Sequence, residues 1–291
     1  MDLKIPGFEY RRVPVAPGVA LNVAVGGAGS PVVLLHGFPQ THLMWRHVAP
    51  ALAAAGHTVV CPDLRGYGDS DKPADPGAYA KRTMAADVVA LAEALGHERF
   101  AVAGHDRGAL VAIRTGLDHP ARVTHLASLD VLPTLDSWEV MRGTGGVVGF
   151  HLYLMAAPPP LPELLIAGAA DAFFGHFLDA WTRDRAAIPP EIRAEYLRAS
   201  RAATPSIVAD YRATAGIDVT HDEQDRAAGH RLRMPVTVLQ QDWGAALGFD
   251  AAARWRAWAD DLTHETVAMG HFMAEENPAE VVRHVLALLA R

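Results

Sequence analysis

The chain has 291 residues, half of them hydrophobic, and it carries 26 Lys and Arg against 33 Asp and Glu, a net charge of −7 with neutral histidines. A chain of this length can bury a large core, either as one α/β domain with an insertion or as two smaller domains. The mild acidity offers no basic surface for the phosphates of nucleic acid, so nucleic acid is not an expected partner.

The only cysteine, Cys61, lies in the apolar run 58–61, which is typical of a buried strand thiol rather than of a nucleophile. No intrachain disulfide can form. The N-terminal residues lack the apolar stretch of a signal peptide, and no later segment is long and apolar enough to span a bilayer. We therefore expect a cytoplasmic protein without a membrane partner.

Short β-rich runs alternate with amphipathic stretches along the chain. Strands are expected at residues 32–35, 58–61, 100–103, 123–127 and 236–239, and helices at 84–95, 109–117 and from Pro278 to Leu288. This alternation predicts an α/β fold with a doubly wound, mostly parallel sheet.

The alternation stops after Leu129 and resumes near Met234. The stretch between them contains several prolines at 158–162 and amphipathic segments such as 192–201, but no strand-like run. A helical insertion between two strands of one sheet can cover their carboxyl ends, where α/β sheets bind ligands. We therefore predict a core domain over 1–132 and 231–291 and a helical cap over 133–230.

A strand-to-helix turn with the sequence Gly104-His105-Asp106-Arg107-Gly108 carries the first candidate for catalysis. Flanking glycines permit the tight nucleophile elbow that thrusts a central side chain, here Asp106, above the sheet. Asp is also a common helix N-cap, so the pattern alone is weak. The surrounding motifs favour the catalytic interpretation.

Two loops follow other predicted strands. In His36-Gly37-Phe38-Pro39, the N–H of Phe38 can point toward the elbow and, with the N–H of Arg107, form an oxyanion hole. In Gly270-His271-Phe272, after the apolar run 266–268, His271 can act as a general base on Asp106. No metal-ligand spacing occurs, and neither a metal nor a cofactor is expected.

The acid that would orient His271 has three candidates. Asp130 ends the strand before the insertion, while Asp242 and Asp250 follow the strand at 236–239. The chain order of nucleophile, acid and histidine fits all three. From the residues alone the choice stays open.

Together these motifs resemble α/β-hydrolases with an aspartate nucleophile, a group that contains haloalkane dehalogenases, haloacetate dehalogenases and epoxide hydrolases. The likeness is greatest to fluoroacetate (haloacetate) dehalogenases. It is carried by the elbow, the His36 to Pro39 loop, Trp45, Asp63-Leu64-Arg65-Gly66-Tyr67-Gly68, the segment 129–134, His151, Asp210-Tyr211-Arg212 and Gly270-His271-Phe272.

The resemblance implies a hydrolytic dehalogenase of small haloacids. Asp106 would attack the halogen-bearing carbon, and water activated by His271 would hydrolyse the resulting ester. The resemblance selects Asp130 as the acid, assigns Arg107 to the substrate carboxylate, and assigns His151 and Tyr211 to the departing halide. It also suggests a homodimer whose only other partners are a small-molecule substrate and water.

Two positions depart from that pattern. Leu110 stands where haloacetate dehalogenases usually have a second carboxylate-binding Arg, and Leu152 stands where they have a halide-binding Trp. The site should be more apolar, which suits a larger haloacid or a neutral halide. The alternative is an epoxide hydrolase, whose first cap tyrosine is replaced here by His151, with Tyr153 nearby as a substitute. A non-catalytic ligand-binding protein is less expected because no triad member is missing.

Overall fold

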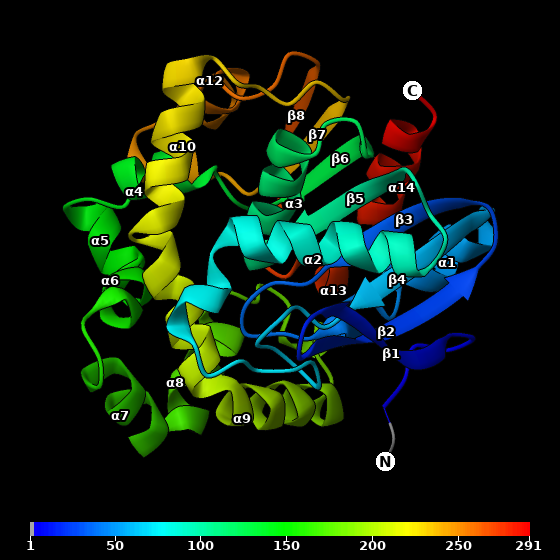
Figure 1. Cartoon of the computed structure of the whole chain (residues 1–291). Helices are drawn as coiled ribbons and strands as arrows, with labels where there is room; N and C mark the ends of the chain where they lie inside the picture. Colours follow the sequence, from blue (N-terminus) through cyan, green and yellow to red (C-terminus); the bar gives the residue numbers. More distant parts are fainter. Residues whose placement is uncertain (1–2) are drawn as a thin grey trace.

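The computed structural model describes residues 3–291 and is organised around one eight-stranded sheet with the order β1-β2-β4-β3-β5-β6-β7-β8 (Figure 1). The strands are β1 (Glu9–Ala16), β2 (Val19–Gly27), β3 (Ser30–Leu35), β4 (His57–Pro62), β5 (Phe100–His105), β6 (Val123–Leu129), β7 (Val236–Gln240) and β8 (Leu262–Thr266). β1 pairs with β2, and β2 with β4, in antiparallel fashion, whereas every later pair is parallel. The predicted α/β fold with a mostly parallel sheet is thus confirmed.

The central strands form from apolar runs because helices cover both of their faces. Every residue of β5 and β7 is buried, and these strands match the predicted ones closely. β1 and β2 are not among the predicted strands, because neither is an apolar run: β1 carries exposed charged residues, and Asn22 interrupts the apolar residues of β2. The run 266–268 was wrongly expected to form the last strand. The true strand, β8, ends at Thr266 and lies at the sheet edge, where solvent exposure removes the need for an apolar run.

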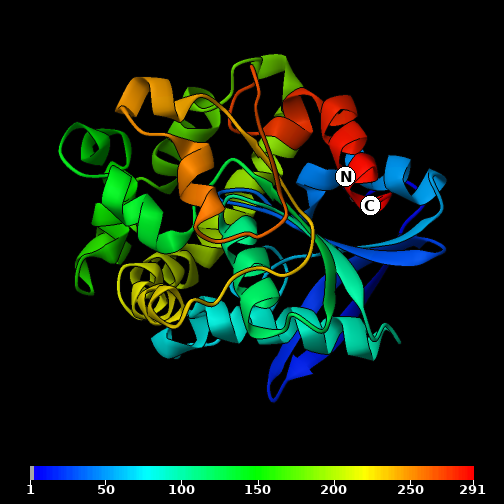
Figure 2. The same cartoon turned by 90° about the horizontal axis from the view of Figure 1, so that it is seen from above.

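Helices pack on both faces of the sheet. One face is covered by α2 (Lys81–Ala94) and α3 (Arg107–Asp118), and the other by α1 (Val48–Ala54) and α14 (Pro278–Leu289), as Figure 2 shows from above. The carbonyl oxygen of the Asn277 side chain accepts the Glu280 N–H and caps α14 at the predicted start. The remaining short helices near the sheet are η1 (His42–Trp45), η2 (Pro76–Tyr79), α11 (Trp243–Leu247), α12 (Ala251–Arg256) and α13 (Met273–Glu276).

All elements that the structure describes between β6 and β7 are helical. They are α4 (Thr134–Val140), α5 (Thr144–Val148), α6 (Phe150–Ala156), α7 (Leu161–Gly168), α8 (Ala170–Ala180), η3 (Arg185–Ala187), α9 (Pro190–Thr214) and α10 (Ile217–Ala228). In Figure 1 these green and yellow helices lie beside the sheet. The division into a core domain and a cap with the stated boundaries stays a prediction.

Within residues 3–291, no single helix is both long and apolar enough to cross a membrane. Only the pair α7 and α8, bent by 82°, passes by length and composition when taken together.

Candidate active site

Asp106 sits on a strained turn between β5 and α3. Its backbone has φ 49° and ψ −116°, values that a residue with a side chain rarely adopts. A Cβ at Gly104 would lie 2.4 Å from the carbonyl oxygen of Gly108, and a Cβ at Gly108 would lie 2.4 Å from the carbonyl oxygens of Leu35 and His36. The elbow can therefore close only with glycine at both positions.

His271 connects the carboxylates of Asp106 and Asp130. Its Nδ1 lies 2.7 Å from Oδ2 of Asp130, and its Nε2 lies 3.9 Å from Oδ2 of Asp106. Asp130 is fully buried, and its two carboxylate oxygens also accept the backbone and side-chain N–H groups of Gln241 at 2.9 and 2.7 Å. The Asp130 carboxyl oxygen held in this way accepts a hydrogen bond from Nδ1 of His271 and fixes the tautomer in which Nδ1 carries the proton and Nε2 is free to accept one.

The other two candidate acids lie elsewhere. Oδ1 of Asp242 accepts the N–H of Ala245, and Oδ1 of Asp250 accepts the N–H of Ala253, each at 2.9 Å. Both side chains thus cap short helices. Of the three candidates, the geometry brings only Asp130 to His271.

The charges around His271 set its proton affinity. Burial alone would lower the pKa of His271, but the hydrogen bond and charge of Asp130, with a smaller contribution from Asp106, outweigh it and raise the pKa above the usual value. Burial would likewise raise the pKa of Asp106, yet the charge of His271 and the Phe38 N–H lower it. Nε2 of His271 is buried and has no hydrogen-bond partner among residues 3–291. The site therefore pairs an ionised carboxylate with an imidazole whose second nitrogen is unoccupied.

The N–H of Phe38 donates to Oδ1 of Asp106 at 2.8 Å. This contact leaves Oδ2, the oxygen that faces His271, as the atom available for attack. The N–H of Arg107 belongs to the first residue of α3, where no intrahelical acceptor exists. Its role as the second donor of an oxyanion hole stays a prediction.

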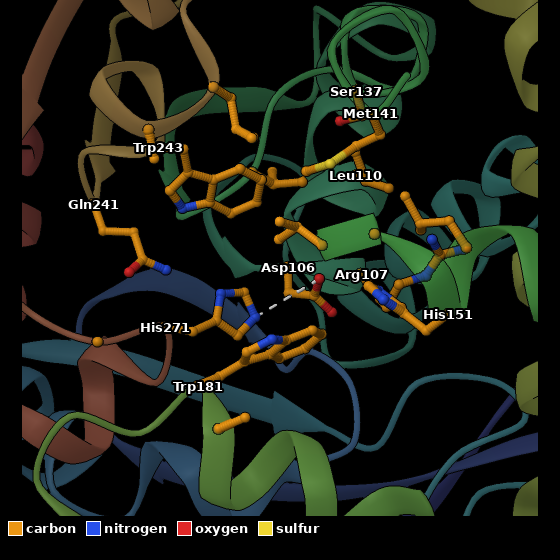
Figure 3. A pocket seen from close by; sticks show the side chains of 18 of the residues that line it. Asp106, Arg107, Leu110, Ser137, Met141, His151, Trp181, Gln241, Trp243 and His271 are labelled. Atoms are coloured by element: carbon orange, nitrogen blue, oxygen red, sulfur yellow. Dashed lines mark ion pairs between the residues drawn. The ribbon is translucent and has the colours of Figure 1, made fainter. Parts of the chain in front are cut away.

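A cavity of about 510 Å³ opens above Asp106 between the sheet and the helices α4, α6, α8, α9 and α11. Figure 3 shows Asp106 at its centre with His271 and Trp181 on one side and Arg107 and His151 on another. The wall contains the sequence-predicted residues Asp106, Arg107, His151, Tyr211 and His271, and also Leu110 and Leu152. Phe38 and Asp130 stand behind the wall: the N–H of Phe38 contacts Asp106, and the carboxylate of Asp130 contacts His271 and Gln241.

Arg107 lines the cavity from an anchored position. Its Nε donates to Oδ2 of Asp210 at 2.8 Å, its Nη2 donates to the carbonyl oxygen of Asp210 at 3.0 Å and to the hydroxyl of Thr214, and its guanidinium lies 4.1 Å from the centre of the Tyr211 ring. No hydrogen bond to any residue in 3–291 uses Nη1. One edge of the guanidinium is fixed by the protein, and one nitrogen is left for a ligand.

His151 and Tyr211 meet on the same side of the cavity, with ring centres 5.7 Å apart. Burial lowers the pKa of His151 to about 3, so the ring is neutral. The Tyr211 hydroxyl is buried and has no hydrogen-bond partner within the described chain. By contrast, the Tyr153 hydroxyl donates to the carbonyl oxygen of Met141 at 2.6 Å, and Tyr153 is 46% exposed and outside the cavity wall. Tyr153 is therefore not the substitute tyrosine considered from the sequence.

The structure adds residues that the motifs did not identify. Trp181 lines the cavity, its ring centre is 4.9 Å from that of His271, and its carbonyl oxygen accepts the His271 N–H at 2.9 Å. Oε2 of Glu276 accepts the N–H groups of Gly270 at 3.2 Å and Arg183 at 3.1 Å, which ties the His271 loop to the segment after α8. Neither Trp181 nor Glu276 belongs to a sequence motif that would have marked it as a site residue. Gln241 could have been found from the sequence, because it is a polar residue directly after a buried strand.

In the part of the chain that the structure describes, no group of three or more His, Cys, Asp or Glu side chains could hold a metal ion. The single cysteine, Cys61, is buried in β4, and burial raises its pKa well above the usual value.

Comparison with known proteins places the chain in a family. A model of the alpha/beta hydrolase fold matches residues 30–147. Fluoroacetate dehalogenase from Burkholderia sp is 38% identical over 284 residues, which cover 95% of this chain and 92% of that protein. Soluble epoxide hydrolase from Corynebacterium sp. (strain C12) is 32% identical over 283 residues, or 94% of each chain.

Solved structures agree with this placement. A putative alpha/beta hydrolase from Nostoc sp PCC 7120 superposes with a TM-score of 0.93 at 39% identity, over 98% of this chain and 99% of that one. A putative epoxide hydrolase from Pseudomonas aeruginosa gives 0.92 at 39% identity, over 100% and 98% of the two chains. The chain therefore belongs to the α/β-hydrolase family and is a hydrolase related to fluoroacetate dehalogenase and to epoxide hydrolases.

Proposed function

We propose that the protein is a hydrolytic dehalogenase of haloacids. The observation that carries this proposal is the presence of a carboxylate nucleophile, Asp106, and a guanidinium with an unoccupied nitrogen, Arg107, in the wall of one cavity. A carboxylate suits displacement at saturated carbon, and a guanidinium suits a substrate carboxylate. The similarity to fluoroacetate dehalogenase supports the same reaction class.

In the first step Oδ2 of Asp106 attacks the halogen-bearing carbon. A carbon–oxygen bond forms, and the carbon–halogen bond breaks with its electron pair on the halide. His151 and Tyr211 stand on the Arg107 side of the cavity and can donate hydrogen bonds to the halide as its charge develops. The product of this step is an ester on Asp106.

In the second step His271 removes a proton from water through Nε2, and the resulting hydroxide attacks the Asp106 carboxyl carbon. The negative oxygen of the tetrahedral intermediate is Oδ1, which the Phe38 N–H already contacts at 2.8 Å. Collapse of the intermediate breaks the bond between the carboxyl carbon and Oδ2, which leaves in the product, while the oxygen from water takes its place in the carboxylate and its remaining proton passes to the departing alkoxide. It releases a hydroxy acid, restores Asp106, and leaves the proton on His271 to pass to solvent.

An epoxide hydrolase would use the same nucleophile and base, and the soluble epoxide hydrolase from Corynebacterium is 32% identical. Opening an epoxide requires a proton donor to its oxygen, and the family commonly supplies two tyrosines. Within residues 3–291 the cavity wall contains Tyr211 but neither Tyr153 nor any other tyrosine. A neutral His151 beside Tyr211 is a weaker match to that chemistry than to a halide site.

Product analysis separates the two reactions. The purified protein is incubated with chloroacetate, 2-chloropropanoate and a matched set of terminal epoxides, and halide and diol are both measured. We expect halide release from the acids and little diol. In parallel, His271→Ala incubated with the best haloacid should gain the mass of the corresponding carboxyalkyl group on Asp106, carboxymethyl in the case of chloroacetate, in intact and peptide mass spectra. Diol formation without halide release, or turnover without any adduct, would refute the proposal.

A further inference from the structure

The cavity is larger than a haloacetate requires. Its volume of about 510 Å³ lies in the range of roughly 300–1,000 Å³ that is typical of pockets for drug-sized ligands. A haloacid with two carbons would occupy only the part next to Asp106. Most of the cavity would then stay unfilled by such a substrate.

The wall of that remaining volume is apolar. It is formed by Leu110, Trp138, Met141, Leu152, Trp243 and Leu247, from α3, α4, α6 and α11. In Figure 3, Met141 and Trp243 lie on the far side of Asp106 from Trp181 and away from His151. An apolar wall of this kind binds by burying hydrocarbon rather than by hydrogen bonds.

The serine and threonine hydroxyls of the wall already donate hydrogen bonds to backbone carbonyl oxygens. The Ser137 hydroxyl donates to the carbonyl oxygen of Leu132 at 2.9 Å, that of Thr182 to Leu178, and that of Thr214 to Asp210. The charged side chains of the wall other than the catalytic ones, Arg183 and Asp242, are exposed. The inner polar groups left for a ligand therefore lie near Arg107, His151 and Tyr211, and the one exception in the apolar wall is the buried Trp243 indole N–H, which has no hydrogen-bond partner within residues 3–291.

These contacts place three of the groups around the halogen-bearing carbon. Under the proposed function, Asp106 forms the new bond, the halide leaves toward His151 and Tyr211, and the carboxylate binds Arg107. One further substituent besides hydrogen remains, and the apolar volume is the space left for it. We propose that the preferred substrates are 2-halo acids whose halogen-bearing carbon carries an extended alkyl or aryl group. This inference rests on the proposed function and adds the substrate class.

A chain-length series tests it. We expect kcat/KM for halide release to rise from 2-chloropropanoate to 2-chlorobutanoate and 2-chlorohexanoate, all of which react at a secondary carbon, by up to roughly fourfold for each methylene that becomes fully buried. One enantiomer of each longer acid should react faster. In the other enantiomer the hydrogen and the alkyl group exchange places, so the alkyl chain would point at the polar side of the cavity instead of the apolar wall. A fall in kcat/KM with length, while chloroacetate is still dehalogenated, would overturn the substrate class and leave the proposed function standing. Failure of every acid to release halide would overturn both.

Two variants in α11 supply a matched pair. Ala246 belongs to the cavity wall, whereas its neighbour Ala245 does not, and both are exposed alanines. Ala246→Asp places a carboxylate at the apolar wall, so we expect the ratio of kcat/KM for 2-chlorohexanoate to that for chloroacetate to fall about tenfold. Ala245→Asp adds the same charge to the same helix and should leave both values at the wild-type level. Equal ratios in both variants and wild type would show that the chain does not contact this wall.

Discussion

Asp210 holds Arg107 in a buried ion pair beneath the cavity. The same carboxylate also accepts hydrogen bonds from the Lys81 ammonium group and, at 2.7 Å, from the Tyr67 hydroxyl. Burial would raise the pKa of Asp210, but the charges of Arg107 and Lys81 lower it far below the usual value. The ion pair fixes Arg107 at one edge, which explains how a long side chain is kept in one orientation toward the cavity.

Asp210→Asn should therefore destabilise the protein strongly. The substitution removes the ion-pair partner of buried Arg107 and leaves buried Lys81 with only the neighbouring charge of Asp218. Breaking a buried pair in this way typically costs about 3–5 kcal/mol in the free energy of unfolding. Denaturant unfolding measures the loss. The control is Asp171→Asn, which removes the exposed partner of Arg201 and should cost little. Similar losses for the two variants would show that the Asp210 cluster contributes no more than a surface pair.

Local patterns predicted the elements that depend on neighbouring residues. The buried strands, the glycines of the elbow and the Asn277 cap could be predicted because each is specified within a few positions. The partnership of Asp210 with Arg107 spans 103 positions, and no short-range pattern indicates it. The choice of Asp130 over Asp242 is of the same kind, because all three candidates follow strands and the sheet order alone would place the end of β7 nearer to β8. Asp130 is selected because its side chain reaches His271, whereas Asp242 and Asp250 cap helices.

Asp130→Asn should slow hydrolysis of the ester by orders of magnitude. An amide at this position cannot hold the required tautomer of His271 as a carboxylate does, nor stabilise the imidazolium that forms. Single-turnover kinetics with halide release and ester decay measured separately would place the loss in the second step. Asp242→Asn and Asp250→Asn alter only helix caps and should react like wild type. A large loss confined to Asp242→Asn would assign the acid to the later strand.

Low pH should separate the two chemical steps. The pKa of His271 is raised above 6.5 and that of Asp106 is lowered, so in mild acid His271 is protonated while Asp106 remains ionised. The base form of His271 falls at least about thirtyfold between pH 8 and pH 5 for any pKa of 6.5 or higher. Ester hydrolysis should slow accordingly as the pH falls, and the adduct on Asp106 should accumulate in acid-quenched samples. In Asp130→Asn the acid limb of the pH profile for ester hydrolysis should move to lower pH, because the pKa of His271 falls when the Asp130 charge is removed. If that limb does not move, a group other than His271 sets it.

Leu110→Arg should shift preference toward small haloacids. Leu110 lies one turn after Arg107 on α3 and belongs to the cavity wall, so a guanidinium there could give the substrate carboxylate a second charged donor. It would also take apolar surface from a longer chain. We expect a lower KM for chloroacetate and a lower kcat/KM for 2-chlorohexanoate. Leu117→Arg, on the same helix but outside the wall, is the control. An unchanged KM in Leu110→Arg would show that position 110 does not face the carboxylate.

Leu152 should limit the release of fluoride. It follows His151 in α6 and lines the cavity, and it offers no donor, while His151 is neutral because burial lowers its pKa to about 3. Fluoride is compact and needs strong hydrogen-bond donors as it departs. Without such a donor at position 152, the transition state for fluoride release loses more stabilisation than that for chloride or bromide release. We expect bromoacetate and chloroacetate to react well ahead of fluoroacetate, and Leu152→Trp to narrow that gap by adding an indole N–H. Leu154→Trp introduces the same side chain outside the wall and should leave the order of the halides unchanged. If the wild-type protein releases fluoride as readily as chloride, the donors already present at His151 and Tyr211 are sufficient and Leu152 does not set the preference.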